Sequence, residues 1–287
     1  MKYYLKGLLF WNNLFYGICA VFLATASSIA LLHKMPGLPT LSLIYFLTVF
    51  YYTWAYLHSY KNEDENERTQ WYQQHASYLK IRQGVLLIAI IYVAFFSINI
   101  FQLFIQADLA VKCIIVFTAV ISLLYYVPLF LNKRDYTIRD NGFFKNFSIA
   151  WVWTVICCLL PIWIGTKSVL LIQLGLSHFW AYFFQLFVFI FILAMLFDIK
   201  DINRDQDRQL NTIVVKYGVM PSFTRFLIPL LLIYVGMGAY LCYCLNLGPW
   251  YLLGEILLAI IVYLIAQRVI HEKLIYRNIL LIDGLML

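Results

Sequence analysis

The chain of 287 residues is 63% hydrophobic and only 12% charged, with a formal net charge of +7. This apolar content is far above that of a soluble domain. The composition therefore excludes a water-soluble enzyme and predicts an all-α, polytopic membrane helix bundle. The six cysteines show no Cys-x-x-Cys or Cys/His spacing, so they give no indication of a zinc site.

Windows of about 20 residues divide the sequence into eight apolar segments and a short ninth one. The eight segments are 8–32, 40–60, 84–106, 110–131, 147–166, 169–197, 222–246 and 249–270. The ninth begins at Asn278 and reaches Leu287, which is too short to cross a bilayer. We therefore predict about nine transmembrane segments, the last short or truncated, in a single integral-membrane domain over residues 1–287.

The basic residues predict the orientation of these segments. If the N-terminus is cytoplasmic, 18 of the 21 lysines and arginines lie on the cytoplasmic side, and only Lys34, Lys112 and Lys167 lie outside. This distribution follows the positive-inside rule and predicts a multi-pass protein of a bacterial inner membrane. The positive charge then faces anionic lipid of the bilayer, so no nucleic acid is needed as a partner to explain it.

Acidic residues gather in two clusters, at 62–67 after the second apolar segment and at 198–207 after the sixth. The even number of intervening segments places both on one membrane face, as expected for two pseudo-repeated four-helix halves. If the sixth helix continues past Phe197, Asp198, Asp201 and Asp205 fall on one helix face and repel one another.

Such a cluster at the membrane edge implies a compensating divalent cation with oxygen ligands. Removing Asp198 or Asp201 is then expected to abolish function while stability holds or rises. The alternative is a solvated helix end, in which the aspartates pair with Lys200, Arg204 and Arg208.

The segment from Asp198 to Gly218 resembles the second aspartate-rich motif of the UbiA family of intramembrane prenyltransferases. It has the DxxDxxxD spacing, followed by Thr212, a short apolar run and Gly218. Lys145-Asn146, which opens the fifth apolar segment after Tyr125-Tyr126-Val-Pro128-Leu, is similar to the cytoplasmic end of the family's fourth and fifth helices. With the segment count and orientation, the likeness covers nearly the whole chain.

The first motif of the family, NDxxD after the second helix, is where this sequence departs from the pattern. Here the chain reads Asn62-Glu63-Asp64-Glu65-Asn66-Glu67. A second placement, one turn earlier at Tyr56, Leu57 and His58, supplies no carboxylate at all. A third interpretation is an ordinary solvated loop with mixed charges.

The resemblance implies Mg²⁺ as cofactor, a prenyl diphosphate donor and a lipophilic, aromatic or other acceptor. The implied metal ligands are Asp198, Asp201, Asp205, Glu63 and Asp64. The implied catalytic residues are Asp198, Asp201 and Lys145. The implied substrate-binding residues are Lys145, Arg139, Arg204, Lys216, Asn62 and Tyr125.

Two other functions stay open at this level. The departure in the first motif favours a relative that binds prenyl lipid without transferring it. Intramembrane carboxylates and tandem halves suit a small-molecule transporter, although the middle of the apolar segments is almost free of charge. One carboxylate, Glu255, lies inside the eighth segment near its outer end and has no role in the implied mechanism.

Overall fold

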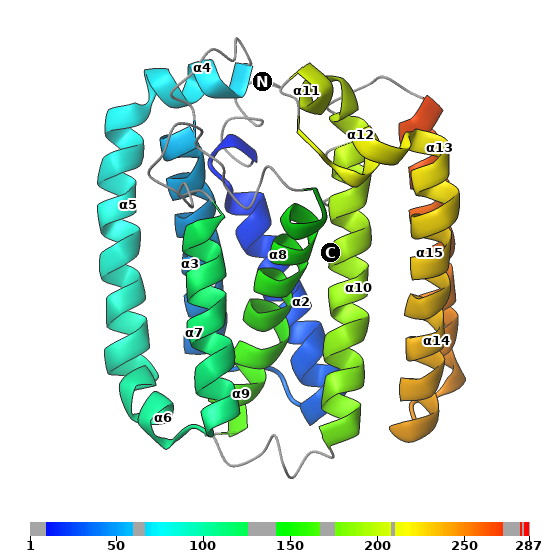
Figure 1. The fold of residues 1–287 in the computed structure, drawn as a ribbon. Coiled ribbons are helices and arrows are strands. Elements are labelled where there is room, and N and C mark those ends of the chain that lie inside the picture. Colours follow the sequence, from blue (N-terminus) through cyan, green and yellow to red (C-terminus); the bar gives the residue numbers. More distant parts are fainter. Residues whose placement is uncertain are drawn as a thin grey trace.

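The computed structural model describes residues 10–59, 67–125, 142–166, 176–207, 210–271, 282 and 284–286. The described chain forms an all-α bundle, with the long helices running side by side (Figure 1). The elements are α2 (Leu14–Leu32), α3 (Leu38–Ser59), α4 (Glu67–Gln74), α5 (Ala76–Ile91), η2 (Tyr92–Ser97), α6 (Ile100–Gln106), α7 (Leu109–Leu124), α8 (Gly142–Thr154), η4 (Val155–Leu159), α9 (Leu160–Thr166), α10 (Leu176–Lys200), α11 (Ile202–Asp207), α12 (Ile213–Tyr217), α13 (Val219–Ser222), η5 (Phe223–Leu227), α14 (Ile228–Cys244) and α15 (Pro249–His271).

Seven helical stretches within the described residues are long and apolar enough to cross a membrane. They are Leu14–Leu32, Leu38–Leu57, Ala76–Ser97, Gly142–Thr166, Ser177–Lys200, Val219–Cys244 and Pro249–Ile270. The helix Leu109–Leu124 is apolar but shorter. The predicted all-α, polytopic bundle is thus confirmed, whereas the short ninth segment from Asn278 lies almost entirely outside the described residues.

The predicted third segment, 84–106, is wrong in its bounds. The helix begins at Ala76 and ends at Ser97, and a separate short helix, α6, follows. Asn99, with φ 57°, separates the two, because asparagine adopts the left-handed conformation more readily than most residues. The 22 residues from Ala76 to Ser97 span about 33 Å at 1.5 Å per residue, enough to cross a bilayer core of about 30 Å.

Two π-helical segments lie one residue before a proline. Leu160 separates η4 from Pro161, and Ile228 separates η5 from Pro229. Proline lacks the N–H that would bond one turn back, and a local widening of the helix accommodates the lost bond. Each of these two apolar stretches therefore continues across its proline as one membrane-length helix.

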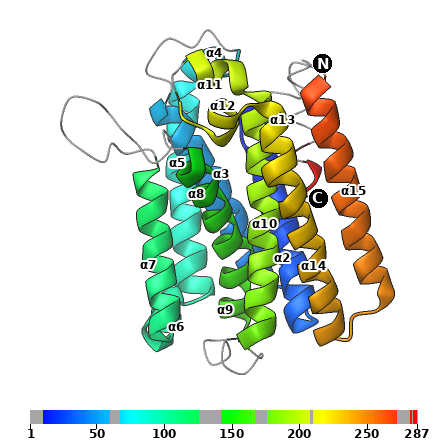
Figure 2. The same cartoon turned by 45° about the vertical axis from the view of Figure 1, so that its right-hand side comes forward.

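The helix α10 is the central element of the bundle, in contact with α8 on one side and α14 on the other (Figures 1 and 2). In its membrane-length window 78% of residues are buried, compared with 17% for the peripheral stretches Ala76–Ser97 and Pro249–Ile270. Aromatic pairs join α10 to α8: Phe147 with Phe187, at 5.4 Å between ring centroids, and Trp151 with Phe183, at 5.8 Å. This packing fixes the position of α8 relative to α10.

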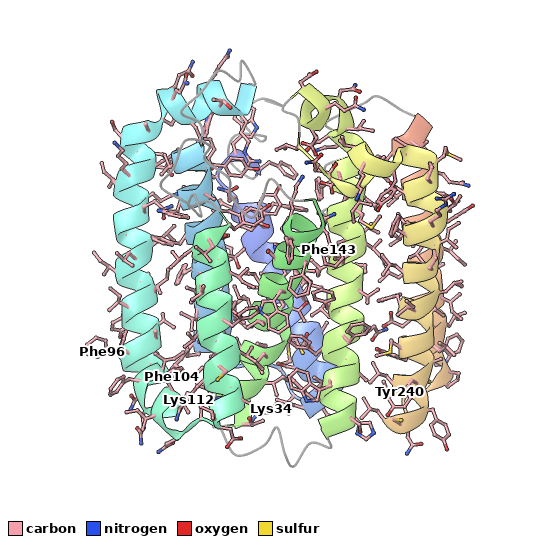
Figure 3. The ribbon with its side chains drawn as sticks, in the orientation of Figure 1. Lys34, Phe96, Phe104, Lys112, Phe143 and Tyr240 are labelled. Carbon is pink, nitrogen blue, oxygen red and sulfur yellow. The ribbon has the colours of Figure 1, made fainter. Side chains whose placement is uncertain are left out.

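The two ends of the bundle differ in their polar content. The short helices α4, α11 and α12 cover one end (Figure 1). Lys34 and Lys112, two of the three basic residues expected outside, lie at the opposite end (Figure 3). The parts of both acidic segments that the structure describes, α4 and α11, thus lie at the same end of the bundle.

Candidate functional site

A buried charge cluster joins the start of α8 to the end of α10. The Lys145 Nζ lies 2.6 Å from Asp198 Oδ1 and 3.4 Å from Asp205 Oδ2. Asn146 donates from Nδ2 to the other oxygen of Asp198, at 2.8 Å. Three of the predicted site residues, far apart in the sequence, are therefore in contact.

Burial makes this cluster energetically important. The Asp198 side chain is 0% exposed and that of Lys145 14% exposed. An ion pair removed from water is strongly destabilised when one partner is deleted, because the remaining charge stays buried without compensation. In the described structure, the positive charge between Asp198 and Asp205 is the Lys145 ammonium.

Asp201 lies beside this cluster rather than within it. Its carboxylate is 24% exposed and lies 3.5 Å from the Lys200 ammonium. The backbone N–H of Asp201 donates to Phe197 O at 2.9 Å, and that of Asp205 donates to Asp201 O at 2.9 Å. The helical path therefore continues from α10 toward α11, which is the condition for the three aspartates to share one helix face.

The carboxylate and amide oxygen atoms of this cluster are of the kind that binds a hard cation. Asn146 is fully buried, and its Oδ1 has no hydrogen-bond partner. Carboxylate and amide oxygens are the ligands that Mg²⁺ accepts, usually one or two carboxylates together with water and substrate phosphate. In the described ranges, no group of three or more His, Cys, Asp or Glu side chains is placed so that it could hold a metal ion.

The motif's threonine and glycine have local structural roles. Thr212 is the N-cap of α12, and its hydroxyl accepts a hydrogen bond from Val215 N at 3.2 Å. Gly218 ends α12 with φ 84°, a conformation that residues with a Cβ rarely adopt. These two residues therefore set the bounds of the short helix that follows the aspartates.

Gly142 connects this segment to α8. The Gly142 N–H donates to Asn211 O at 3.0 Å. A Cβ placed on Gly142 would lie 2.1 Å from Thr212 Cα and 2.5 Å from Asn211 O. Only glycine allows this close approach of two backbones, which holds the start of α8 against the segment after α11.

We expect Gly142→Ala to lower apparent stability by about 1–3 kcal/mol, as overpacking does, and to displace Lys145 from the aspartates. Gly84→Ala is the matched control, because Gly84 is also helical and a Cβ added there would have nothing within 4 Å. Alanine there should be neutral or stabilising by about 0.5–1 kcal/mol. Thermal unfolding in detergent measures both, and equal midpoints for the two variants would contradict the role assigned to Gly142.

The other predicted site residues are not all brought to this cluster. Lys216 is exposed on α12, and its ammonium lies 5.1 Å from the ring centroid of Tyr217. Tyr125 is buried at the end of α7. The following predicted residues, or their side chains, lie outside the described part of the chain: Asn62, Glu63, Asp64, Arg139 and Arg204.

No protein-family model matches this sequence, and neither the curated proteins nor the solved structures contain a match.

Two polar networks in the structure are not predicted by the sequence. At the end of the bundle that carries α4, Arg68 and Arg82 contact Asn12, Asn13 and Thr53. The available signal is the pair of asparagines directly before an apolar helix. The sequence predicts only that both arginines contribute to the positive charge on the cytoplasmic side, because their partners are distant along the chain.

The second network surrounds Glu255. Tyr234 donates a hydrogen bond to Glu255, and Tyr251 donates to Gln185 Oε1 at 3.4 Å. Gln185 is 3% exposed, and its Nε2 has no hydrogen-bond partner. This network joins α10, α14 and α15, and such bonds hold membrane helices together.

Proposed function

We propose that this chain is a magnesium-dependent intramembrane prenyltransferase of the UbiA type. The observation that carries the proposal is the meeting of Lys145 and Asn146 with Asp198 and Asp205 at one end of an apolar bundle. A donor with a charged diphosphate and a hydrocarbon tail requires both environments side by side. The resemblance of the sequence motif supports the same assignment independently of these contacts.

In this proposal Lys145 contacts the donor's diphosphate, and Asp198 positions Lys145. A lysine ammonium is a compact charge that binds phosphate well. Bound magnesium supplies further positive charge for the leaving diphosphate. Asp201, Asp205 and the Asn146 Oδ1 are the described groups that would hold it, since both oxygens of Asp198 already accept hydrogen bonds.

Aromatic residues of α2, α3 and α8 suit the carbon skeleton of the donor. Tyr16 and Tyr52 stack at 4.6 Å, and Trp153 Nε1 donates to the Tyr52 hydroxyl at 2.8 Å. Aromatic faces attract cations, so they stabilise positive charge developing at the allylic carbon. The surrounding apolar side chains exclude water, which would otherwise capture that carbon.

The test is mass spectrometry of products formed by purified protein in lipid nanodiscs. The reactions contain a panel of prenyl diphosphates and lipophilic aromatic acceptors, with magnesium or with EDTA. We expect a prenylated acceptor and release of pyrophosphate with magnesium only. Donor binding without product would instead indicate a prenyl-lipid-binding relative, and uptake of solute into proteoliposomes would indicate a transporter.

Several finer expectations belong to this proposal. They are the nine-segment arrangement in two four-helix halves, the cytoplasmic position of the charged end and the bacterial inner membrane as location. Cysteine labelling of intact cells at Lys34→Cys and Lys216→Cys tests the orientation, because the two positions lie on opposite faces in the proposed topology. Labelling of Lys34→Cys alone by an impermeant reagent is the expected outcome.

A further inference from the structure

The Arg68–Arg82 network is a second basic site at the charged end of the bundle. Arg68, on α4, donates to Asn13 Oδ1 at 2.6 Å and to the Tyr56 hydroxyl at 2.9 Å. Its guanidinium carbon lies 3.6 Å from the centroid of the Tyr56 ring. Arg82, on α5, donates to Asn12 Oδ1 and, at 2.7 Å, to Thr53 Oγ1.

The two arginines belong to one connected network. Asn13 accepts from Arg68 and donates from Nδ2 to Thr53 Oγ1 at 3.0 Å, and the same Thr53 oxygen accepts from Arg82. Asn13 Nδ2 also donates to the Tyr72 hydroxyl at 2.8 Å. Burial raises the pKa of Tyr72, so this hydroxyl stays protonated and donates to Trp11 O.

The acceptors that hold Arg82 are neutral. The sequence contains no aspartate or glutamate between residues 10 and 59 or between residues 68 and 107. No ion pair to Arg82 is present in the described part of the chain, and its buried Nε–H has no acceptor. A partly buried guanidinium bound only to neutral oxygens retains its charge and a free donor, which suits an anion.

The location of this network relates it to the Lys145 cluster. Both networks lie at the end of the bundle covered by α4 and α11 (Figure 1). Tyr52 of α3, one residue before Thr53, contacts Trp153 of α8. The arginines thus lie next to the end of α3, where the resemblance leads one to expect a first carboxylate motif.

We propose that Arg82, with Arg68 beside it, binds a phosphate of the diphosphate donor directly, in the place where a second carboxylate–magnesium site is expected. Guanidinium groups bind phosphate through paired, charge-assisted hydrogen bonds. The donor's diphosphate then lies between two basic sites, Lys145 on α8 and Arg82 on α5. The inference rests on the proposed function for the identity of the donor, but binding of the anion is measurable without transfer.

The experiment measures the affinity of inorganic pyrophosphate for the purified protein in phosphatidylcholine nanodiscs, in EDTA. Arg82→Gln should weaken binding about 10- to 160-fold, the factor that corresponds to one lost charge-assisted hydrogen bond of about 1.5–3 kcal/mol. Lys80→Gln is the matched control, since Lys80 is exposed on the same helix and its removal changes the net charge equally. It should leave the affinity unchanged within about twofold, the small effect expected of a screened surface charge.

Folding is controlled by size-exclusion chromatography and the thermal midpoint of each variant. If Arg82→Gln does not fold, Arg82→Lys takes its place in the binding measurement. Weaker pyrophosphate binding by Arg82→Lys than by wild type supports the inference, because lysine lacks the forked donors of arginine. Unchanged affinity overturns it. Unchanged affinity of folded Arg82→Gln, or no binding by wild type in EDTA, also overturns it. If no preparation, wild type included, shows transfer activity while pyrophosphate binding still depends on Arg82, the proposed function is rejected but this site is not.

A lipid headgroup is the other source of a phosphate at this depth. Nanodiscs containing phosphatidylglycerol distinguish it from the donor, because co-purifying lipid is quantified by mass spectrometry. Phosphatidylglycerol enrichment that is lost in Arg82→Gln, combined with unchanged pyrophosphate affinity, would assign the arginines to lipid and overturn the proposal. Arg82-dependent pyrophosphate affinity in both lipid compositions supports it.

Discussion

Replacing Asp198 with asparagine is expected to lower the proposed prenyl transfer by about 10²–10³-fold, the loss typical for removal of one preorganised electrostatic group. Asparagine has nearly the same shape but no charge. It leaves Lys145 with only the longer contact, 3.4 Å to Asp205. The rate of product formation at saturating magnesium and donor measures the effect.

The same variant should also be less stable than wild type, by about 3 kcal/mol, the lower end for breaking a buried ion pair. Repulsion among the three aspartates alone would make the variant more stable than wild type. The contacts lead to the opposite expectation, since Asp198 is buried and its oxygens are bound by Lys145 and Asn146. Asp207→Asn is the control, because Asp207 is exposed at the end of α11. Equal thermal midpoints for both variants would contradict the ion-pair argument.

Lys145→Met is expected to abolish measurable transfer and to lower stability by about 3–5 kcal/mol, because Asp198 then remains buried without its cation. The double variant Lys145→Met/Asp198→Asn should be less destabilised than the sum of the single variants. A coupling free energy of about 1–3 kcal/mol is expected for residues in direct contact. Thermal and denaturant unfolding of the four proteins of this cycle supply the measurement.

The transfer rates of these variants distinguish a role of Lys145 in binding diphosphate from a role in folding alone. If Lys145 only stabilises the bundle, the folded fraction of the double variant should regain activity along with stability. If Lys145 binds diphosphate, the double variant stays inactive while its stability partly returns. Lys80→Met is the control, because Lys80 is exposed and makes no ion pair in the described structure.

The apolar segments predict the helices well, because a membrane-length run of apolar residues has few alternatives. The failures occur where polar residues belong to a helix. Hydropathy places residues 76–83 in a loop because of Lys80, Arg82 and Gln83. In the structure Arg82 bonds to Thr53, and Gln83 donates to Phe50 O at 2.9 Å. Hydropathy alone does not reveal that neighbouring helices satisfy such groups.

The candidate site is predictable in its residues but not in its contacts. The spacing of Asp198, Asp201 and Asp205 and the position of Lys145 follow from motifs. That Lys145 contacts Asp198 and Asp205, while Asp201 lies beside Lys200, depends on how α8 packs against α10. No separate role for Asn146 follows from the sequence, since a single amide at a helix start carries no chemical pattern.

The hydrogen bond from Gly142 to Asn211 has a consequence for biogenesis. All charged groups of the Lys145 cluster lie between Gly142 and Asp205, and the bond that fixes them is completed at Asn211. Because synthesis runs from the N-terminus, every group of the polar centre is therefore made before α14 and α15. Its charges can pair without any residue of the last membrane hairpin.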